Sequence, residues 1–194
     1  MGKYEALITD LDGTLVKTNI NWDKLRAKVR GVLKTNHPLK PLGLSVYILT
    51  RNNPKLRERA FKIIEKEELE AARKVFFDKK LYEIFTYLKF RNIKIGLVTL
   101  QSRRTALIIL NRLGLIKFFR TIITRDDSLD RFVQLRIAID ELGVKPSKTV
   151  FVGDTLWDYE AGLKMGCKTV IVGSFDELTG CDSVRSIYEI VNYF

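Results

Sequence analysis

The sequence predicts an α/β protein built on a three-layer, doubly wound parallel sheet of the Rossmann-like kind, with a small helical cap inserted after the first strand. Short apolar runs at 6–8, 93–99 and 149–153 have the length and composition of buried strands. From Asp78 onward, strand-like runs alternate with amphipathic helical stretches, which favours a parallel sheet. Right-handed crossovers then place helices on both faces of that sheet.

The segment 17–77, between the first and second strands, is expected to be helical and to form the small cap. Asn21 has the residue type of an N-cap and precedes a stretch with helical spacing of apolar residues. Asn53 and Pro54 have the residue types of an N-cap and a first helical residue, so a long helix is predicted to begin there. The apolar stretch 44–51 is compatible with a helix or a strand, and we favour a helix.

The remainder of the chain continues the alternation of helices and strands. Later strands are predicted at 121–124 and 168–172, and helices at 103–113, 132–142, 157–165 and near 184–192. Gly114 and Gly143 follow two of these helices, as is typical of helix C-termini. Segments 1–16 and 78–194 are therefore predicted to form one core domain, which the cap interrupts.

Two carboxylates follow the first strand directly. Asp10 and Asp12 are two residues apart, so a strand places them on one side, and Gly13 allows a sharp turn after them. Neighbouring carboxylates raise each other's proton affinity unless a cation lies between them, and Mg²⁺ prefers oxygen ligands of this kind. Since Asp and Gly are also common in turns, the same stretch is compatible with an acidic turn that has no catalytic role.

Two later strands also end in polar residues. Asp154 follows one of them, with Asp158 four residues further on, and Thr99 ends the other. In open α/β sheets, ligands bind beyond the carboxyl ends of the strands. We therefore expect these side chains to meet the first two carboxylates at one rim of the sheet. Asp158 could instead be an exposed residue that opens a helix.

These motifs resemble those of the haloacid dehalogenase (HAD) superfamily of phosphohydrolases, and in particular its phosphoglycolate phosphatase-like members. The matching residues are Asp10-x-Asp12-Gly13-Thr14, Thr99 and Gly153-Asp154-x-x-x-Asp158, in the family's order and spacing. The resemblance covers the chain except the segment from about 17 to 77, where the family carries a helical cap over the active site. It implies Mg²⁺ as the cofactor and a small phosphorylated metabolite as the substrate.

The resemblance also implies catalytic roles. Asp10 would be the nucleophile that forms an aspartyl-phosphate, and Asp12 would be the general acid and base. The hydroxyl of Thr99 and the backbone amide of Leu100 would bind the phosphate. Family members that cleave carbon–halogen or phosphonate bonds lack the second aspartate, so Asp12 points to phosphate esters.

A metal site is implied in the same way. Mg²⁺ would bind a carboxylate oxygen of Asp10, the backbone carbonyl of Asp12 and the side chain of Asp154, with water completing its coordination. Asp158 would hold the metal site, either directly or through water.

One family element is missing from the chain. The family normally places a Lys, often followed by Pro, between the second and last motifs, where it balances the charges of the phosphate and the nucleophile. No Lys occurs between Lys117 and Lys145. Arg131 is the predicted substitute and Arg125 is the second choice, since an Arg stays charged and can bind phosphate through two N–H groups.

The substrate is left open by the sequence. In the family, the cap and the segment after the first motif select it. Four polar residues of that region could recognise an anionic leaving group, or could simply be exposed: Asn19, Arg51, Asn52 and Arg57. A phosphoglycolate-like small acid, a sugar phosphate and a nucleotide all remain open.

Composition and charge limit the alternatives. The net charge of +11 would attract polyanions, yet Lys and Arg are spread along the chain beside Glu, so an ion-paired surface is favoured over a nucleic-acid site. No apolar run approaches the roughly 18 residues of a membrane span, and no room is left for a signal peptide, so we expect a cytoplasmic protein without a membrane partner. Cys167 and Cys181 lack metal-ligand or redox spacing. The oligomeric state is not predicted.

Three functions therefore remain open. A Mg²⁺-dependent phosphatase that hydrolyses a small phosphate monoester through an aspartyl-phosphate fits the motifs most directly. A phosphosugar mutase would use the same aspartyl-phosphate but release little free phosphate. A basic nucleic-acid-binding module on an inactive HAD fold conflicts with four retained aspartates, because clustered acids are costly to keep without a metal.

Overall fold

A computed structural model describes residues 3–173 and 181–194 and contains one six-stranded parallel sheet. The strand order is β3-β2-β1-β4-β5-β6, so the chain starts in the middle and fills one side of the sheet before the other. The strands are β1 (Ala6–Thr9), β2 (Lys94–Val98), β3 (Thr121–Ile123), β4 (Thr149–Gly153), β5 (Lys168–Val172) and β6 (Asp182–Val184). The predicted doubly wound architecture is confirmed.

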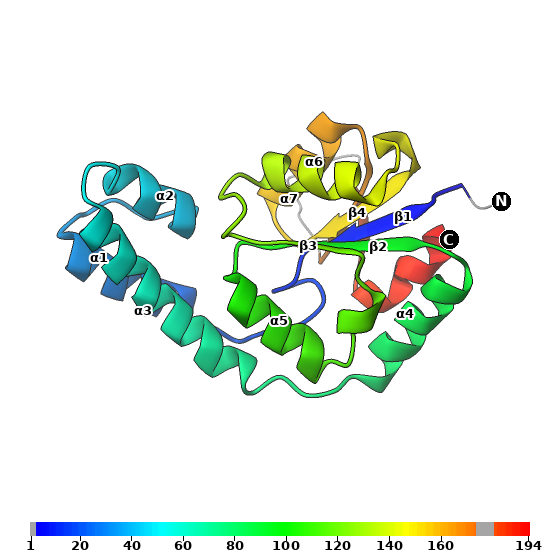
Figure 1. Cartoon of the computed structure of the whole chain (residues 1–194), viewed down its shortest axis with the longest axis horizontal. Helices are drawn as coiled ribbons and strands as arrows, with labels where there is room; N and C mark the ends of the chain where they lie inside the picture. The colour runs from blue at the N-terminus through cyan, green and yellow to red at the C-terminus, as the bar shows by residue number, and fades with distance from the viewer. Residues whose placement is uncertain (1–2, 174–180) are drawn as a thin grey trace.

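Helices cover both faces of the sheet, as Figure 1 shows. They are α4 (Lys79–Phe90), α5 (Arg103–Arg112), α6 (Arg131–Leu142) and α7 (Leu156–Met165), with short 3-10 helices at Ile116–Phe118, Pro146–Lys148 and Ile187–Tyr193. In that view α6 and α7 lie on one face, and α4 and α5 lie on the other.

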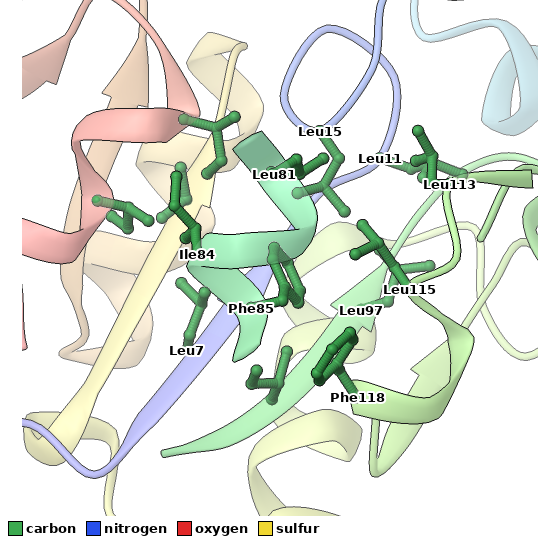
Figure 2. Packing of buried hydrophobic residues seen from close by; sticks show 14 of the residues in the cluster. Leu7, Leu11, Leu15, Leu81, Ile84, Phe85, Leu97, Leu113, Leu115 and Phe118 are labelled. Carbon is green, nitrogen blue, oxygen red and sulfur yellow. The ribbon is translucent and has the colours of Figure 1, made fainter. Parts of the chain in front are cut away.

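Alternating residues of the strands fill two hydrophobic clusters. Leu7 and Leu97 point toward α4 and α5 and pack with Phe85, as Figure 2 shows. Ile8 and Val98, one position further along each strand, belong to the cluster formed with α6. This two-residue period is the expected pattern of a sheet that is buried on both faces, and it explains why the strands are continuous apolar runs in the sequence.

Three helices follow β1 before the chain returns to the sheet. They are α1 (Trp22–Leu33), α2 (Leu42–Leu49) and α3 (Pro54–Ala72). Asn21 and Asn53 cap α1 and α3, and each side chain accepts a hydrogen bond from the backbone N–H of the third residue of its helix. The helix favoured for 44–51 is confirmed by α2.

The helical insert has a hydrophobic cluster of its own. Its buried residues are Leu25, Val29, Leu39, Val46, Ala60 and Ile64. Figure 1 shows α1 and α2 to one side of the sheet, while the C-terminal half of α3 runs back toward α5. None of the helices in the described ranges has the length and apolar content that a membrane crossing requires.

The prediction for the C-terminus is wrong in two respects. The expected helix near 184–192 is preceded by an unpredicted strand, β6, which pairs in parallel with β5 and contains Val184. The helical turns that follow, at Ile187–Tyr193, are of the 3-10 type. The strand was missed because Asp-Ser-Val carries no apolar run, so its conformation comes from the edge of β5 rather than from local sequence.

Candidate active site

A cleft of about 1380 Å³ is lined both by residues at the carboxyl ends of the strands and by residues of the helical insert. The structure brings all of the predicted catalytic, phosphate-binding and metal-binding residues to its wall. They are Asp10, Asp12, Thr99, Leu100, Arg131, Asp154 and Asp158. They come from the ends of β1, β2 and β4 and from the first turns of α6 and α7, as expected for the rim of an open parallel sheet.

The turn after β1 requires its glycine. Gly13 has a φ of +87°, which side chains rarely tolerate, and a Cβ there would lie 1.9 Å from Oδ2 of Asp154. The backbone after β1 therefore approaches the carboxylate at the end of β4 directly. Thr14 adds a long hydrogen bond from its hydroxyl to Oδ1 of Asp154, at 3.5 Å.

Arg131 joins two of the clustered acids. Its terminal nitrogen Nη2 donates to Oδ1 of Asp10 at 2.7 Å. Its Nε lies 2.8 Å from Oδ1 of Asp158, an ion pair without the direction of a good hydrogen bond. The Arg131 side chain is only 11% exposed, so both ion pairs are shielded from water.

The acids at this rim exceed the positive charge beside them. Burial raises the pKa of Asp10 well above its usual range; the guanidinium of Arg131 opposes this shift, while the neighbouring aspartates add to it. Burial, followed by the charges of Asp158 and Asp12, raises the pKa of Asp154 to about 7. Each shift means that the ionised carboxylate is disfavoured where it stands.

This excess of negative charge fits a divalent cation. Asp154 is partly buried, and Thr14 is its one hydrogen-bond donor within the described residues. In 3–173 and 181–194, no three acidic, histidine or cysteine side chains gather closely enough to ligate a metal by themselves. A cation beside Asp10 and Asp154 would therefore need main-chain and water oxygens as well, which Mg²⁺ accepts readily.

Asp12 is held on the insert side of the site. Its Oδ1 accepts hydrogen bonds from the backbone N–H and the hydroxyl of Thr18, at 2.8 and 2.7 Å. Burial raises the pKa of Asp12, and the bonds from Thr18 partly offset that rise. A carboxyl with a raised pKa is suited to carrying a proton in one step and releasing it in another.

Asp158 both opens a helix and faces the cleft. It forms a capping box with Thr155, in which each side chain accepts a hydrogen bond from the other residue's backbone N–H. Asp158 is fully buried, so the alternative of an exposed helix-opening residue is wrong. Its second oxygen, Oδ1, is the one beside Arg131.

Thr99 and Leu100 lie at the end of β2. The Thr99 side chain is buried, and its Oγ1 accepts a hydrogen bond from the N–H of Gln101 at 3.2 Å. Within the described residues, the hydroxyl hydrogen of Thr99 has no acceptor, so it is available to a ligand in the cleft.

Arg125, the second choice for the missing Lys, is engaged elsewhere. It makes two hydrogen bonds to the carboxylate of Glu68, at 2.7 and 2.9 Å, and a third to the backbone carbonyl of Leu100 at 2.9 Å. Glu68 belongs to α3, so this pair connects the insert with the loops at the ends of β2 and β3. Sequence spacing gave no sign of Glu68, because it lies in a helix with many charged residues.

Other cleft residues were also missed by the sequence. Of the four candidates for leaving-group recognition, Asn19 lines the cleft, whereas Arg51, Asn52 and Arg57 are not among the lining residues. The insert contributes Arg26 and Lys40 instead. Trp22 and Arg26 both line the cleft and are one helical turn apart in α1, a spacing that could have indicated a shared face.

Gln101 is a further cleft residue with an unusual environment. It is 3% exposed, and neither polar atom of its side-chain amide has a hydrogen-bond partner among the described residues. Buried amides are normally paired, so this one marks a place where a bound molecule could supply the missing partners.

Comparison with known proteins agrees with the fold and identifies the family. A family model described as haloacid dehalogenase-like hydrolase matches residues 7–172. The protein named pyrophosphatase PpaX from Bacillus velezensis is 31% identical over 182 residues, which cover 86% of this chain and 82% of the relative.

Solved structures share the fold at lower sequence identity. The β-phosphoglucomutase from Clostridium difficile has a TM-score of 0.74 at 21% identity, with 96% of this chain and 93% of that chain covered. A candidate phosphoglycolate phosphatase from Lactobacillus plantarum has a TM-score of 0.72 at 17% identity, with both chains covered fully. The predicted enzyme class, an HAD hydrolase with phosphatases among its relatives, is confirmed: the chain belongs to the haloacid dehalogenase-like hydrolase family.

Proposed function

We propose that this protein is a Mg²⁺-dependent phosphatase that hydrolyses a small phosphate monoester through an aspartyl-phosphate on Asp10. The observation that carries the proposal is the ion pair between Asp10 and Arg131 at the carboxyl end of β1, with Asp154 close enough to raise the pKa of Asp10. This arrangement offers a carboxylate nucleophile, a cation for the phosphoryl oxygens and a further acid for a metal.

Each residue has a defined part in the proposed reaction. A carboxylate oxygen of Asp10 attacks phosphorus, and the bond from phosphorus to the ester oxygen breaks. Asp12, in its protonated form, gives its proton to the departing oxygen. Asp12 then takes a proton from a water molecule, which attacks the phosphorus and frees Asp10 and inorganic phosphate. The raised pKa of Asp12 supports the first of its two roles.

Other groups would hold the phosphate and the metal. Arg131 and the hydroxyl of Thr99 would bind phosphoryl oxygens, together with the N–H of Leu100. Mg²⁺ would be held by the side chains of Asp10 and Asp154 and the carbonyl of Asp12, and when bound it neutralises the negative charges that must meet. Asp158 would position Arg131 and the metal site rather than touch the phosphate.

The helical insert would act as a cap that selects the leaving group. Segment 17–77 supplies one wall of the cleft, and segments 1–16 and 78–194 supply the catalytic rim. Arg26 and Lys40 line the insert's wall, so a leaving group with its own negative charge is favoured. Small phosphorylated acids meet this requirement. So does pyrophosphate, to which the name of the Bacillus velezensis relative refers, although it is a phosphoric anhydride rather than an ester.

The test is phosphate release from a panel of substrates: pyrophosphate, phosphoglycolate, a sugar phosphate and a nucleoside monophosphate. Each is assayed with Mg²⁺ and with a chelator, using the wild type, Asp10→Asn and the exposed control Asp140→Asn. We expect Mg²⁺-dependent release that Asp10→Asn abolishes and Asp140→Asn preserves. Release that persists in Asp10→Asn would disprove the mechanism.

The same assay separates the leaving groups and the mutase. Arg26→Ala should raise the Michaelis constant more for substrates whose leaving group carries its own negative charge than for the sugar phosphate, whose leaving group is uncharged. A phosphosugar mutase would interconvert sugar phosphates, need a phosphorylated activator and release little phosphate. Such a result would replace hydrolysis with phosphoryl transfer while leaving Asp10 as the nucleophile.

A further inference from the structure

The side chain of Gln134 lies behind the catalytic rim, one turn after Arg131 in α6. It is fully buried. Its Oε1 accepts a hydrogen bond from Nη1 of Arg131 at 3.0 Å. Its Nε2 donates to the carbonyl of Thr99 at 2.8 Å and to the carbonyl of Ser128 at 2.7 Å. Both hydrogens and the oxygen of the amide are therefore used.

These partners fix the orientation of the amide. Turning it over would place its oxygen against two carbonyl oxygens and its NH₂ group against a guanidinium, so every contact would become repulsive. The amide thus links three parts of the site: the end of β2 at Thr99, the loop before α6 at Ser128, and the guanidinium of Arg131. A buried group with all of its bonds satisfied is rigid, and it is suited to holding a neighbour in place.

Arg131 needs such a partner because its side chain is long. Its contacts with Asp10 and Asp158 involve Nη2 and Nε, and the contact with Asp158 is poorly directed. Gln134 is the acceptor for Nη1. Each terminal nitrogen carries two hydrogens, so one N–H on Nη1 and one on Nη2 have no partner among the described residues and can bind phosphoryl oxygens. Without Gln134, rotation about the side chain could turn this pair of donors away from Asp10.

We propose that Gln134 is a positioning residue. Its amide is anchored to the carbonyl of Thr99 at the end of β2 and directs the guanidinium of Arg131 toward the phosphoryl group. The proposal rests on the proposed function for its effect on turnover, but its effect on phosphate binding does not depend on hydrolysis. A lysine in place of Arg131 would have no nitrogen at the position of Nη1 and could not bond to Gln134. The proposed effect of Gln134 therefore depends on Arg131, and the two residues act as one unit.

A double-mutant cycle tests this unit. The variants are Gln134→Met, Arg131→Lys and the two combined, with Arg136→Met, an exposed residue of the same helix, as the matched control. The dissociation constant of inorganic phosphate is measured by calorimetry, and kcat and KM are measured with the best substrate. Gln134→Met should weaken phosphate binding and lower kcat/KM by about 10-fold or more, the usual scale for residues that support a catalytic group. Arg136→Met should change neither.

The combined variant decides between positioning and a structural role. If Gln134 acts through Arg131, Gln134→Met should cost less than about 2-fold when Arg131 is already Lys. An equal loss in both backgrounds would mean that Gln134 only ties the two loops together, and it would overturn the proposal. Unchanged phosphate binding in Gln134→Met would overturn it as well.

A check of folding and a replacement variant keep the test decisive. Circular dichroism establishes that each variant is folded. If Gln134→Met does not fold, Gln134→Asn replaces it in the same cycle, since its shorter amide cannot span Arg131 and both carbonyls. A wild type that binds phosphate but hydrolyses no ester would contradict the proposed function alone, because the phosphate cycle would still report on Gln134.

Discussion

Two arginines, six positions apart after β3, are similarly shielded from water but have different partners. The side chains of Arg125 and Arg131 are 8% and 11% exposed. Arg125 meets a single carboxylate, that of Glu68, through two hydrogen bonds and adds a third to a carbonyl. Arg131 meets two carboxylates, those of Asp10 and Asp158.

The difference lies in how completely the charges are matched. The pair of Arg125 and Glu68 is one cation with one anion, and its geometry is that of a two-pronged, charge-assisted contact between the insert and the core. Around Arg131 the acids outnumber the cation, and burial, with the neighbouring carboxylates adding to it, raises the pKa values of Asp10 and Asp154. We infer that the matched pair stabilises the fold, whereas the unmatched group is arranged to receive a ligand.

The largest expected effect is that of Asp10→Asn, which should lower turnover by at least about 1,000-fold, because an amide cannot serve as the nucleophile. The thermal midpoint should not fall. The pKa of Asp10 is raised in the folded chain, so its ionised form at neutral pH works against folding, and a neutral amide removes that cost. Phosphate release and the thermal midpoint are the two measurements.

A lower thermal midpoint in Asp10→Asn would contradict the contrast between Arg131 and Arg125. It would mean that the ion pair with Arg131 contributes to folding as the pair of Arg125 and Glu68 is expected to do. The control is Asp140→Asn, which changes an exposed acid of α6 and should leave both quantities as in the wild type.

The second effect concerns Arg131. Arg131→Lys keeps a positive charge but has a single nitrogen, which cannot reach Asp10, Asp158 and Gln134 together. We expect kcat/KM to fall by about 10- to 100-fold, the loss typical of a misplaced charged group, and Arg131→Ala to lose more. Steady-state kinetics check this expectation. Wild-type kinetics in Arg131→Ala would show that another cation balances the phosphate.

The contrast between the two arginines also shows how far the sequence could lead. The sequence ranked Arg131 first because it stands at the start of a predicted helix, and the structure places it beside Asp10. Arg125 was the second choice, and nothing in a linear pattern showed that residue 125 pairs with residue 68. Their contact depends on where α3 packs against the core, which is a tertiary property.

The same limit explains what was predicted of the fold. The strands β1, β2, β4 and β5 were identifiable because burial on both faces makes them continuous apolar runs. The edge strand β6 has no such signal. In the site, clustered aspartates at strand ends were recognisable, whereas Gln134 and Gln101 were not, since their importance comes from partners, or a lack of partners, in three dimensions.

The third effect is on stability rather than on turnover. Arg125→Met leaves Glu68, which is 1% exposed, without its cation, and breaking a buried pair in this way costs about 3–5 kcal/mol of unfolding free energy. The double variant Arg125→Met with Glu68→Met should recover part of that loss, because no buried charge remains. Urea denaturation measures the free energies of unfolding of the wild type, Arg125→Met and the double variant.

Turnover distinguishes this pair from Arg131. We expect kcat/KM of the folded Arg125→Met protein to fall less than that of Arg131→Lys, since Arg125 touches the carbonyl of Leu100 but none of the catalytic acids. A larger fall would mean that the contact between insert and core sets the position of the phosphate-binding loop, and the two arginines would then share one function.

The smallest effect is expected for an ion pair on the surface of the insert. Lys62 and Glu58 lie one turn apart in α3, with side chains 72% and 65% exposed. Water screens such a pair, so Glu58→Gln should leave the urea midpoint and kcat/KM unchanged within error. If this exposed pair proved as important to stability as that of Arg125 and Glu68, burial could not be the reason for the strength of the latter.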